Sequence, residues 1–331
     1  MLYALTVPTV ADRIAQMVVK IYFELKVEPY FHPDSYGYRP GKSATDALAT
    51  TRKRCWKQDW VLEFDIKGLF DNISHELLMK AVCKHTDNPW VILYIRRWLE
   101  APFQLKDGTV EKREKGTPQG GVISPLLANL FLHYAFDMWM VRNHPGKPFA
   151  RYADDGVAHC DNKKDAEELL VSLRERLAEC GLELHPGKTR IIYCKDDDRK
   201  GNHPETKFDF LGYTFQPRRS KNKYGKFFIN FTPAVSGKAK KAMRETIQGW
   251  RIHLKPDKAI EDLSRMFNSV IRGWVNYYGR FYKSEMYPVL AHMNRALVRW
   301  VRKKYKKLKH QRRATHWLGK VARREQKLFV H

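Results

Sequence analysis

The chain has 331 residues, of which 43% are hydrophobic and 13% aromatic, so an intrinsically disordered chain is excluded. A formal net charge of +25 favours a polyanionic partner, either nucleic acid or an anionic membrane. No apolar run is long enough to span a bilayer, and the N-terminus lacks a signal-peptide pattern. We therefore expect no membrane partner and a cytoplasmic location. None of the five cysteines forms a CxxC pair and no HExxH occurs, which disfavours a zinc site.

The first third of the chain predicts a helix, a loop and a strand, in that order. Apolar residues recur at helical spacing over 14–25, and Pro29 ends the pattern. Glycine and proline make the stretch 35–41 a loop. Residues 60–66 alternate between apolar and polar, as in a strand whose polar face carries Asp65.

The middle of the chain alternates between predicted helices and strands. Ser74 is placed to cap a helix that buries Leu77, Leu78, Ala81 and Val82. Ser124-Pro125 opens a further helix, with proline at the first helical position. Residues 149–160 predict two short strands around a tight turn, and 165–180 predict an amphipathic helix that Gly181 ends.

The last part of the chain changes character near Pro233. Strands are predicted over 182–194, 207–216 and 227–231, and after them the apolar spacing is helical throughout. Strands and helices mixed in this way predict an α+β fold that is followed by an all-helical region. The predicted divisions are residues 1–216, a basic hairpin or linker over 217–235, and a helical domain over 236–331.

Carboxylates stand at two of the predicted strand ends. Tyr152-Ala-Asp-Asp155 lies on the predicted tight turn, and Asp65 lies near the end of another strand. Acids that neighbouring strands bring together can hold two divalent ions roughly 3.5–4 Å apart, as in two-metal phosphoryl-transfer sites. Taken alone, Asp-Asp in a turn is also ordinary turn chemistry.

Six segments, in order along the chain, carry a family resemblance: Phe64-Asp-Ile-Lys-Gly-Leu-Phe70, Gly116-Thr-Pro-Gln-Gly-Gly-Val-Ile-Ser-Pro-Leu-Leu-Ala-Asn129, Tyr152-Ala-Asp-Asp155, Leu184-His-Pro-Gly-Lys188, Phe208-Asp-Phe-Leu-Gly-Tyr-Thr-Phe215 and Gly273-Trp-Val-Asn-Tyr-Tyr-Gly279. Together they resemble the catalytic, nucleotide-pocket, primer-contact and maturase motifs of group II intron reverse transcriptases. The resemblance implies a right-hand polymerase palm with partial fingers over 1–216. It also implies an all-helical thumb, the maturase domain, behind the palm.

The resemblance implies the catalytic roles. Asp65 and Asp154 would ligate two Mg²⁺ ions, or Mn²⁺ in their place, and the Ile66 carbonyl would assist. Asp155 would support the site and bind metal more weakly. Lys188 would donate a proton to the pyrophosphate leaving group or neutralise it. A solvated surface lysine is the alternative interpretation of Lys188.

Four residues are implied to contact the incoming deoxynucleoside triphosphate. Phe70 lies where the family has an aromatic steric gate against the sugar, and a core phenylalanine is the alternative. Gln119 would contact the nucleotide or its template base, and Gly120 would let the backbone come close. Arg39 lies in a fingers segment and would contact template or nucleotide, unless it is a structural loop arginine.

Two regions are implied to bind primer or RNA. The first is the strand pair that carries Phe210, Leu211, Gly212 and Tyr213. The second is the basic C-terminal run, where twelve Lys or Arg residues lie between Arg302 and Lys327 with one acid among them. We expect RNA contacts from Lys303, Lys304, Lys306 and Lys307. Interleaved aromatic residues would add stacking to the phosphate contacts.

The sequence therefore predicts an RNA-directed DNA polymerase whose partners are an RNA template, intron RNA, a DNA primer or target, and deoxynucleoside triphosphates. A role in intron splicing and mobility is expected with it. The alternatives are an RNA-binding splicing maturase with little polymerase activity and a defence-associated reverse transcriptase. Complete family members carry a first fingers motif before the segment that resembles 5–13 here. We therefore expect a truncated member that polymerises weakly alone and still binds RNA. The sequence does not indicate an oligomeric state.

Overall fold

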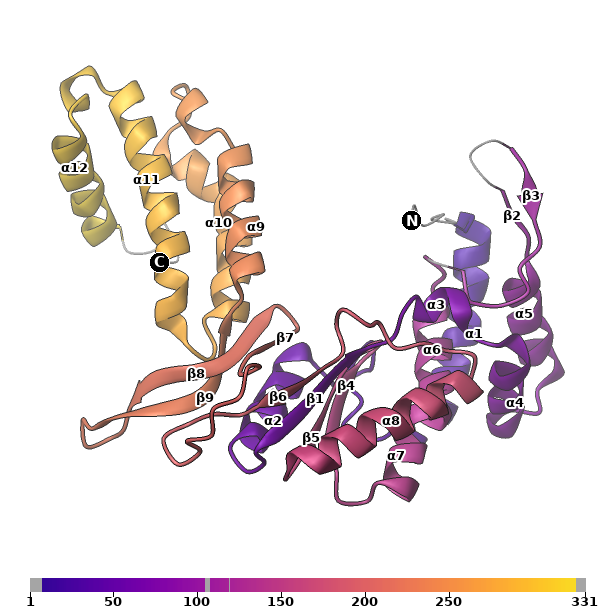
Figure 1. Ribbon diagram of the computed structural model, residues 1–331. Helices are drawn as coiled ribbons and strands as arrows, with labels where there is room; N and C mark the ends of the chain where they lie inside the picture. The colour runs from indigo at the N-terminus through magenta and orange to yellow at the C-terminus, as the bar shows by residue number, and fades with distance from the viewer. Residues whose placement is uncertain (1–7, 105–107, 119, 326–331) are drawn as a thin grey trace. The chain divides into compact units, whose positions relative to one another are not determined.

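The computed structural model describes residues 8–104, 108–118 and 120–325 (Figure 1). The chain forms two compact units, Met1–Thr206 and Lys207–His331. The structural division precedes the sequence-based boundary at 216/217, because the strands that begin at Phe208 pack with the C-terminal helices.

The first unit is built on a four-stranded antiparallel sheet in the order β4-β5-β1-β6. The strands are β1 (Trp60–Asp65), β4 (Phe149–Tyr152), β5 (Asp155–Cys160) and β6 (Arg190–Tyr193). The predicted strand at 60–66 and the predicted strand pair in 149–160 are confirmed. The strand predicted over 182–194 is reduced to β6, preceded by an isolated bridge between Ile66 and Leu184.

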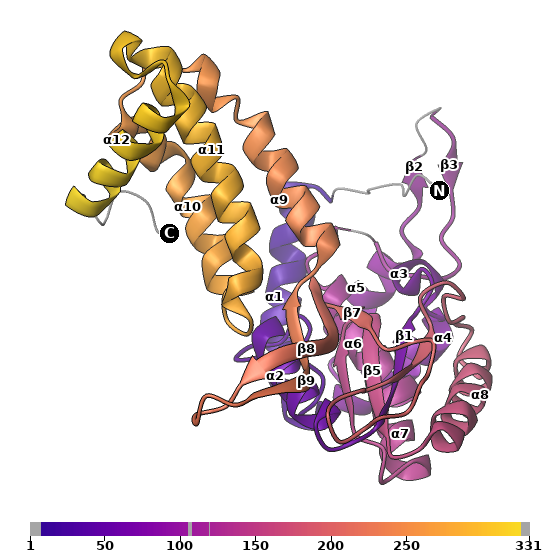
Figure 2. The same cartoon turned by 60° about the vertical axis from the view of Figure 1, so that its left-hand side comes forward.

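Helices cover the sheet. In Figure 2, α8 (Lys163–Glu179) and α2 (Ala44–Cys55) lie on opposite sides of the sheet. Leu62 and Phe64 of β1 share one core with Leu169 and Leu173 of α8, so the even-numbered side chains of β1 are buried beneath helices. Asp65 points to the opposite face because side chains alternate along a strand. The remaining helices of this unit are α1 (Val10–Val27), α3 (Leu69–Asn72), α4 (His75–His85), α5 (Pro89–Glu100), α6 (Ser124–Leu132) and α7 (Met138–Asn143), with a one-turn 3₁₀-helix η1 (Glu28–Tyr30), a π-helix η2 (His133–Asp137) and a short hairpin of β2 (Phe103–Gln104) and β3 (Val110–Glu111).

Helix α1 leaves its apolar stripe exposed, and α4 buries one residue fewer than predicted. Helix α1 forms as predicted, but its apolar stripe is exposed, and Ile14 is 62% accessible. Its buried residues are Gln16, Phe23 and Val27. In α4, which Ser74 caps as predicted, Leu77 is 36% exposed rather than buried, since the core takes only Leu78, Ala81 and Val82.

The second unit joins a small sheet to a helical bundle. The sheet contains β7 (Phe208–Phe210), β8 (Tyr213–Lys221) and β9 (Phe227–Val235), paired in sequence order. The bundle contains α9 (Gly237–Gly249), α10 (Ile260–Tyr278), α11 (Tyr287–Lys304) and α12 (Gln311–Arg324), with the short 3₁₀-helices η3 (Ile252–Leu254), η4 (Lys283–Met286) and η5 (Lys306–Leu308). Its core is formed by residues at the predicted helical spacing, among them Leu263, Phe267, Met293 and Trp300. None of the helices in the described residues combines the length and the apolar character needed to cross a bilayer.

Candidate active site

Three carboxylates meet where β1 ends and β5 begins. Asp65, the last residue of β1, is paired in register with Asp155, the first residue of β5. Asp154 lies in the turn between β4 and β5, and its carbonyl oxygen accepts a 3.2 Å hydrogen bond from the amide of Ile66. The structure thus brings together the three predicted acids and Ile66 at one edge of the sheet.

Lys188 lies directly against Asp65. Its Nζ is 3.1 and 3.2 Å from the two carboxylate oxygens of Asp65, and the hydrogen bond raises the pKa of the lysine. The Lys188 side chain is 59% exposed, whereas that of Asp65 is 11% exposed. An exposed cation on a buried anion can move away without unfolding the strand end, so Lys188 is a removable counterion of this site.

Burial and neighbouring negative charges raise the pKa of two of these carboxylates. Burial raises the pKa of Asp155 to about 7, and the negative charges of Asp65, Asp154 and Glu63 add to the effect. Burial and the nearby Asp65 also raise the pKa of Asp154. Packing three acids together therefore stores electrostatic repulsion that a cation would relieve.

The donor chemistry suits a hard divalent cation. Carboxylate and carbonyl oxygens are the ligands that Mg²⁺ prefers. In the described part of the chain, however, no three His, Cys, Asp or Glu side chains are arranged to hold a metal ion. The Lys188 ammonium group contacts both carboxylate oxygens of Asp65, so it would compete with a metal ion for this ligand.

The predicted nucleotide-pocket loop packs beside the start of α3. Phe70 is half-buried against the core, and its carbonyl oxygen accepts a 2.6 Å hydrogen bond from the amide of Thr117. Gly120 is exposed at a φ of 93°, and Gln119 lies outside the described residues. Sequence reasoning missed Gln16 of α1, whose buried side-chain oxygen accepts a 2.7 Å hydrogen bond from the amide of Val122. A polar residue among apolar neighbours was its only signal.

Arg39 is engaged within its own loop. Its guanidinium donates to the Glu28 carboxylate at 2.7 and 2.9 Å, and to the carbonyl oxygens of His32 and Ser35 at 2.6 and 2.7 Å. The side chain is 6% exposed. These contacts are those of the structural loop arginine.

In the second unit, the predicted primer-contact turn joins β7 and β8. Leu211 and Gly212 both have positive φ, at 50° and 78°, which makes the connection a tight two-residue turn. Phe210 and Tyr213 on either side are buried. The Tyr213 hydroxyl donates to the carbonyl oxygen of Tyr277, so this turn is attached to the Gly273–Gly279 motif of α10.

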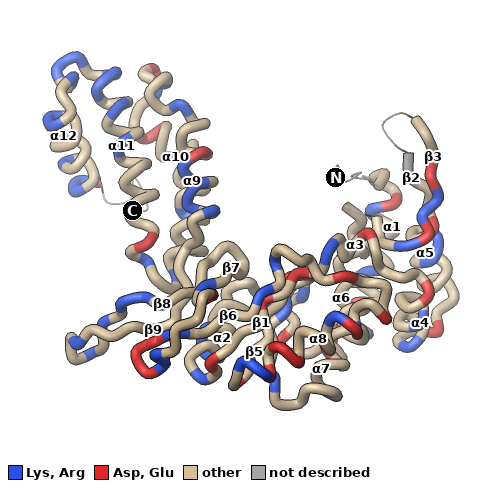
Figure 3. Tube along the Cα trace, viewed as in Figure 1, with Lys and Arg blue, Asp and Glu red and all other residues tan. Residues whose placement is uncertain are grey.

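Basic side chains gather on the bundle and on the β8–β9 hairpin (Figure 3). Lys303, Lys306 and Lys307 are exposed. Lys304 is instead half-buried, and its Nζ donates to the carbonyl oxygens of Pro256 and Lys258 at 2.7 Å each. The tip of the hairpin carries Tyr224, which is 82% exposed.

Residues 3–215 match the family model of the reverse transcriptase (RNA-dependent DNA polymerase). The chain belongs to the reverse transcriptase family. Residues 240–318 of this reverse transcriptase match a second family model, the group II intron maturase-specific domain. The predicted family and the predicted order of its two parts are thereby confirmed.

Individual relatives agree with this assignment. Group II intron-encoded protein LtrA of Lactococcus lactis subsp. cremoris is 39% identical over 129 residues, which are 39% of this reverse transcriptase and 21% of LtrA. Protein YkfC of Escherichia coli (strain K12) is 28% identical over 262 residues, 68% of this chain and 65% of YkfC. Both alignments span less than two thirds of the relative. Apo telomerase from Candida tropicalis has the same fold, with a TM-score of 0.52 at 12% identity, over 88% of this chain and 55% of that one.

Proposed function

We propose that this chain is an RNA-directed DNA polymerase of the group II intron type, which extends a DNA primer on an RNA template. The observation that carries the proposal is the meeting of Asp65, Asp154 and Asp155 at one sheet edge, in a chain that matches the reverse transcriptase family over residues 3–215. The family generally uses divalent metal ions. We propose two Mg²⁺ ions here, for which Mn²⁺ could substitute.

Asp65 and Asp154 would ligate the metal, assisted by the Ile66 carbonyl, and Asp155 would support the site and bind metal more weakly. Bound divalent cations would neutralise the charge that develops on the α-phosphate and on the leaving pyrophosphate. The Lys188 ammonium group, which lies against Asp65, would neutralise or protonate that leaving group. Phe70 would pack against the sugar, and the loop that contains Gln119 and Gly120 would contact the base pair being formed.

The maturase-type bundle supports a second activity, the binding of intron RNA during splicing and mobility. LtrA is named as a group II intron-encoded protein, and residues 240–318 match the maturase-specific model. Exposed cations such as Lys303, Lys306 and Lys307 would contact RNA phosphates. A maturase with little polymerase activity and a defence-associated enzyme are the remaining candidates.

Primer extension under single-turnover conditions tests the polymerase. The purified chain, in excess over a DNA primer annealed to an RNA template, is mixed with deoxynucleotides and Mg²⁺, which makes even slow synthesis visible. We expect extension that EDTA abolishes and that Mg²⁺ or Mn²⁺ restores. Binding of intron RNA without any extension would instead support the maturase alternative. A chain that neither binds intron RNA nor extends the primer would contradict both proposals.

A further inference from the structure

The arginine directly before the Tyr152–Asp155 turn is fully buried and uses all five of its N–H donors. Nε and Nη2 of Arg151 donate to the two carboxylate oxygens of Asp137 at 2.8 and 2.7 Å. Nη2 also donates to Ser35 Oγ at 2.8 Å. Nη1 donates to Asn129 Oδ1 at 3.2 Å and to the carbonyl oxygen of Ala153 at 3.1 Å. A guanidinium group has five such donors, so this one is saturated.

These contacts join four segments that are distant in sequence. Arg151 also forms two backbone hydrogen bonds with the loop that contains Ser35. Its amide donates to the Asp34 carbonyl oxygen at 3.0 Å, and its carbonyl oxygen accepts from the Tyr36 amide at 2.8 Å. Asn129, the last residue of the nucleotide-pocket motif, donates to the Gly37 carbonyl at 2.6 Å. A methyl group on Gly37 would lie 2.6 Å from the amide nitrogen of Ala153, so this loop touches the turn itself.

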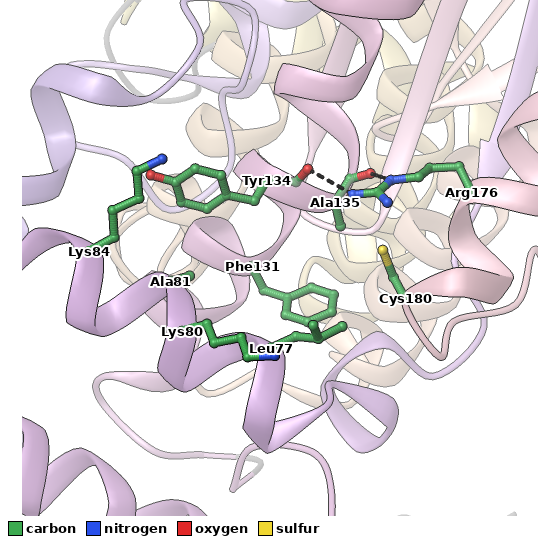
Figure 4. Close-up of a pocket in the computed structure, with 9 residues that line it drawn as sticks. All are labelled: Leu77, Lys80, Ala81, Lys84, Phe131, Tyr134, Ala135, Arg176 and Cys180. Carbon is green, nitrogen blue, oxygen red and sulfur yellow. Dashed lines mark hydrogen bonds between the residues drawn. The ribbon is translucent and has the colours of Figure 1, made fainter.

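The carboxylate that faces Arg151 comes from an irregular helical turn. Asp137 is the last residue of the π-helix η2, and its side chain is fully buried. A π-turn inserts one extra residue, is rare, and loosens the helical hydrogen bonding. Figure 4 shows Arg176 of α8 reaching the carbonyl groups of Tyr134 and Ala135 in this turn, at 3.3 and 3.0 Å. Two arginines thus contact the widened turn. Arg176 binds its backbone carbonyl groups, and Arg151 binds its Asp137 carboxylate.

The turn that Arg151 contacts has a strained backbone. Ala153 has a φ of 58°, a left-handed conformation that is unfavourable for a residue with a Cβ. Its carbonyl oxygen accepts from Arg151, and the next two residues are Asp154 and Asp155. The Arg151 side chain lies on the same face of the sheet as Phe149 and Phe64, which pack with α8, so it does not compete with the face that carries Asp65 and Asp155.

We propose that Arg151, fixed by Asp137, is a positioning residue that holds Ala153 left-handed and so sets the place of the Asp154 and Asp155 carboxylates. The inference rests on the proposed polymerase function and adds to it. It also couples the turn to the nucleotide-pocket helix through Asn129. Arg151 itself touches no substrate.

A matched arginine in the loop after β6 separates positioning from stability. Arg199 donates to the carbonyl oxygens of Cys55, Cys194 and Trp56 at 2.6, 3.0 and 2.8 Å, and its Nε lies 2.8 Å from Asp59. These partners flank the Trp60 end of β1, opposite the Asp65 end. Arg199→Met therefore removes a comparable set of bonds without reaching the turn.

The experiment compares Arg151→Met, Arg151→Lys, the double variant Arg151→Met with Asp137→Leu, and Arg199→Met. We expect Arg151→Met to lower the single-turnover extension rate about 100-fold, the loss typical of a displaced catalytic group, with the KM for deoxynucleotide unchanged. The double variant should recover thermal stability, since no lone carboxylate stays buried, but not the rate. Arg151→Lys should keep a positive charge opposite Asp137 and still lose rate, because lysine cannot supply five donors. Arg199→Met should keep the rate of its folded fraction.

A second readout does not depend on activity. Amide hydrogen exchange at residues 153–156 should become faster in Arg151→Met and in the double variant, and stay at the wild-type rate in Arg199→Met. Unchanged exchange there, or a rate that the double variant or Arg151→Lys restores, would overturn the inference. A wild-type protein that shows no extension would contradict the proposed function alone, because the exchange measurement would still decide the role of Arg151.

Discussion

The hydroxyl group of Tyr277 donates a 2.8 Å hydrogen bond to the carbonyl oxygen of Leu211, and the hydroxyl of Tyr213 donates back to the carbonyl oxygen of Tyr277. The first pair joins α10 to the tight turn between β7 and β8. Two motifs that are separate in sequence, Phe208–Phe215 and Gly273–Gly279, are therefore one structural element. Any movement of α10 is expected to move the predicted primer-contact turn with it.

Gly212 tests how closely α10 approaches this turn. An added Cβ would lie 2.9 Å from the Tyr278 hydroxyl oxygen, and φ is +78°. Gly225 has a similar φ of +85° but meets only the flexible end of Lys221, at 3.5 Å. Both alanine substitutions should lose about 1–2 kcal/mol of unfolding free energy from the left-handed backbone. Gly212→Ala should lose more in urea denaturation, and Tyr278→Phe should restore part of the excess. Equal losses at the two glycines would contradict this close approach.

His159 predicts an acid-sensitive core. Its side chain is fully buried, and neither ring nitrogen has a hydrogen-bond partner among the described residues. Burial, together with the smaller effect of the Arg54 charge, lowers its pKa from the usual 6.5 to about 3. As pH falls from 6.5 towards 3, the unfolded chain binds a proton before the folded chain does. The stability present above pH 6.5 is therefore lost across this window.

His159→Phe should flatten that part of the stability–pH curve, measured by urea unfolding between pH 7 and pH 4. At pH 7 the variant should be as stable as the wild type or more stable, by up to about 1–3 kcal/mol, because an unpaired buried polar group is removed. His253→Asn, a change at an exposed histidine, is the control and should leave the curve as it is. A wild-type slope in His159→Phe would show that another group titrates.

The bundle lysines predict salt-dependent RNA binding. Replacing Lys303, Lys306 and Lys307 by glutamine should weaken RNA binding and lower the slope of log K against log salt, by about 0.7 for each phosphate that is no longer neutralised. Lys304 stays unchanged, because its ammonium group caps backbone carbonyls. The same substitution at the exposed Lys57, Lys163 and Lys164 is the charge-matched control. If both triple variants weakened RNA binding equally, the bundle lysines would contribute only through the net charge of the protein.

Phe70 predicts sugar selectivity. Phe70, the second residue of α3, is only partly buried against the core, so part of it is accessible. Phe70→Ala should raise the ratio of ribonucleotide to deoxynucleotide incorporation about 10-fold or more, the scale of a change in pocket size. The ratio of kcat/KM for the two sugars is the measurement. An unchanged ratio would return Phe70 to the hydrophobic core.

Local patterns predicted where each acid lies, but not that the acids meet. The alternation in 60–66 put Asp65 on the polar face of a strand, and the turn at 152–155 followed from two apolar strands around Asp-Asp. Family order then supplied the pairing of these strands, which local periodicity cannot provide. The register of Asp65 with Asp155 is the result.

Features that depend on tertiary packing could not be predicted from the sequence. In α1 the regular apolar stripe that includes Ile14 is exposed, while the helix buries Gln16, since backbone amides of the nucleotide-pocket loop need an acceptor there. Arg151 could not be singled out either. A charged residue within a predicted strand is read as solvent-exposed until its partners, from the loop at 35 and from a π-turn, are known.

The single-turnover rate of primer extension in Asp154→Asn tests the central claim most directly. Asp161→Asn, the same change at an exposed acid after the opposite end of β5, is the matched control. The account predicts that Asp154→Asn lowers the Mg²⁺-dependent rate by about 100-fold or more, with RNA affinity unchanged, while Asp161→Asn extends at the wild-type rate. Equal extension by Asp154→Asn and Asp161→Asn would contradict the assignment of the carboxylate cluster as a polymerase active site.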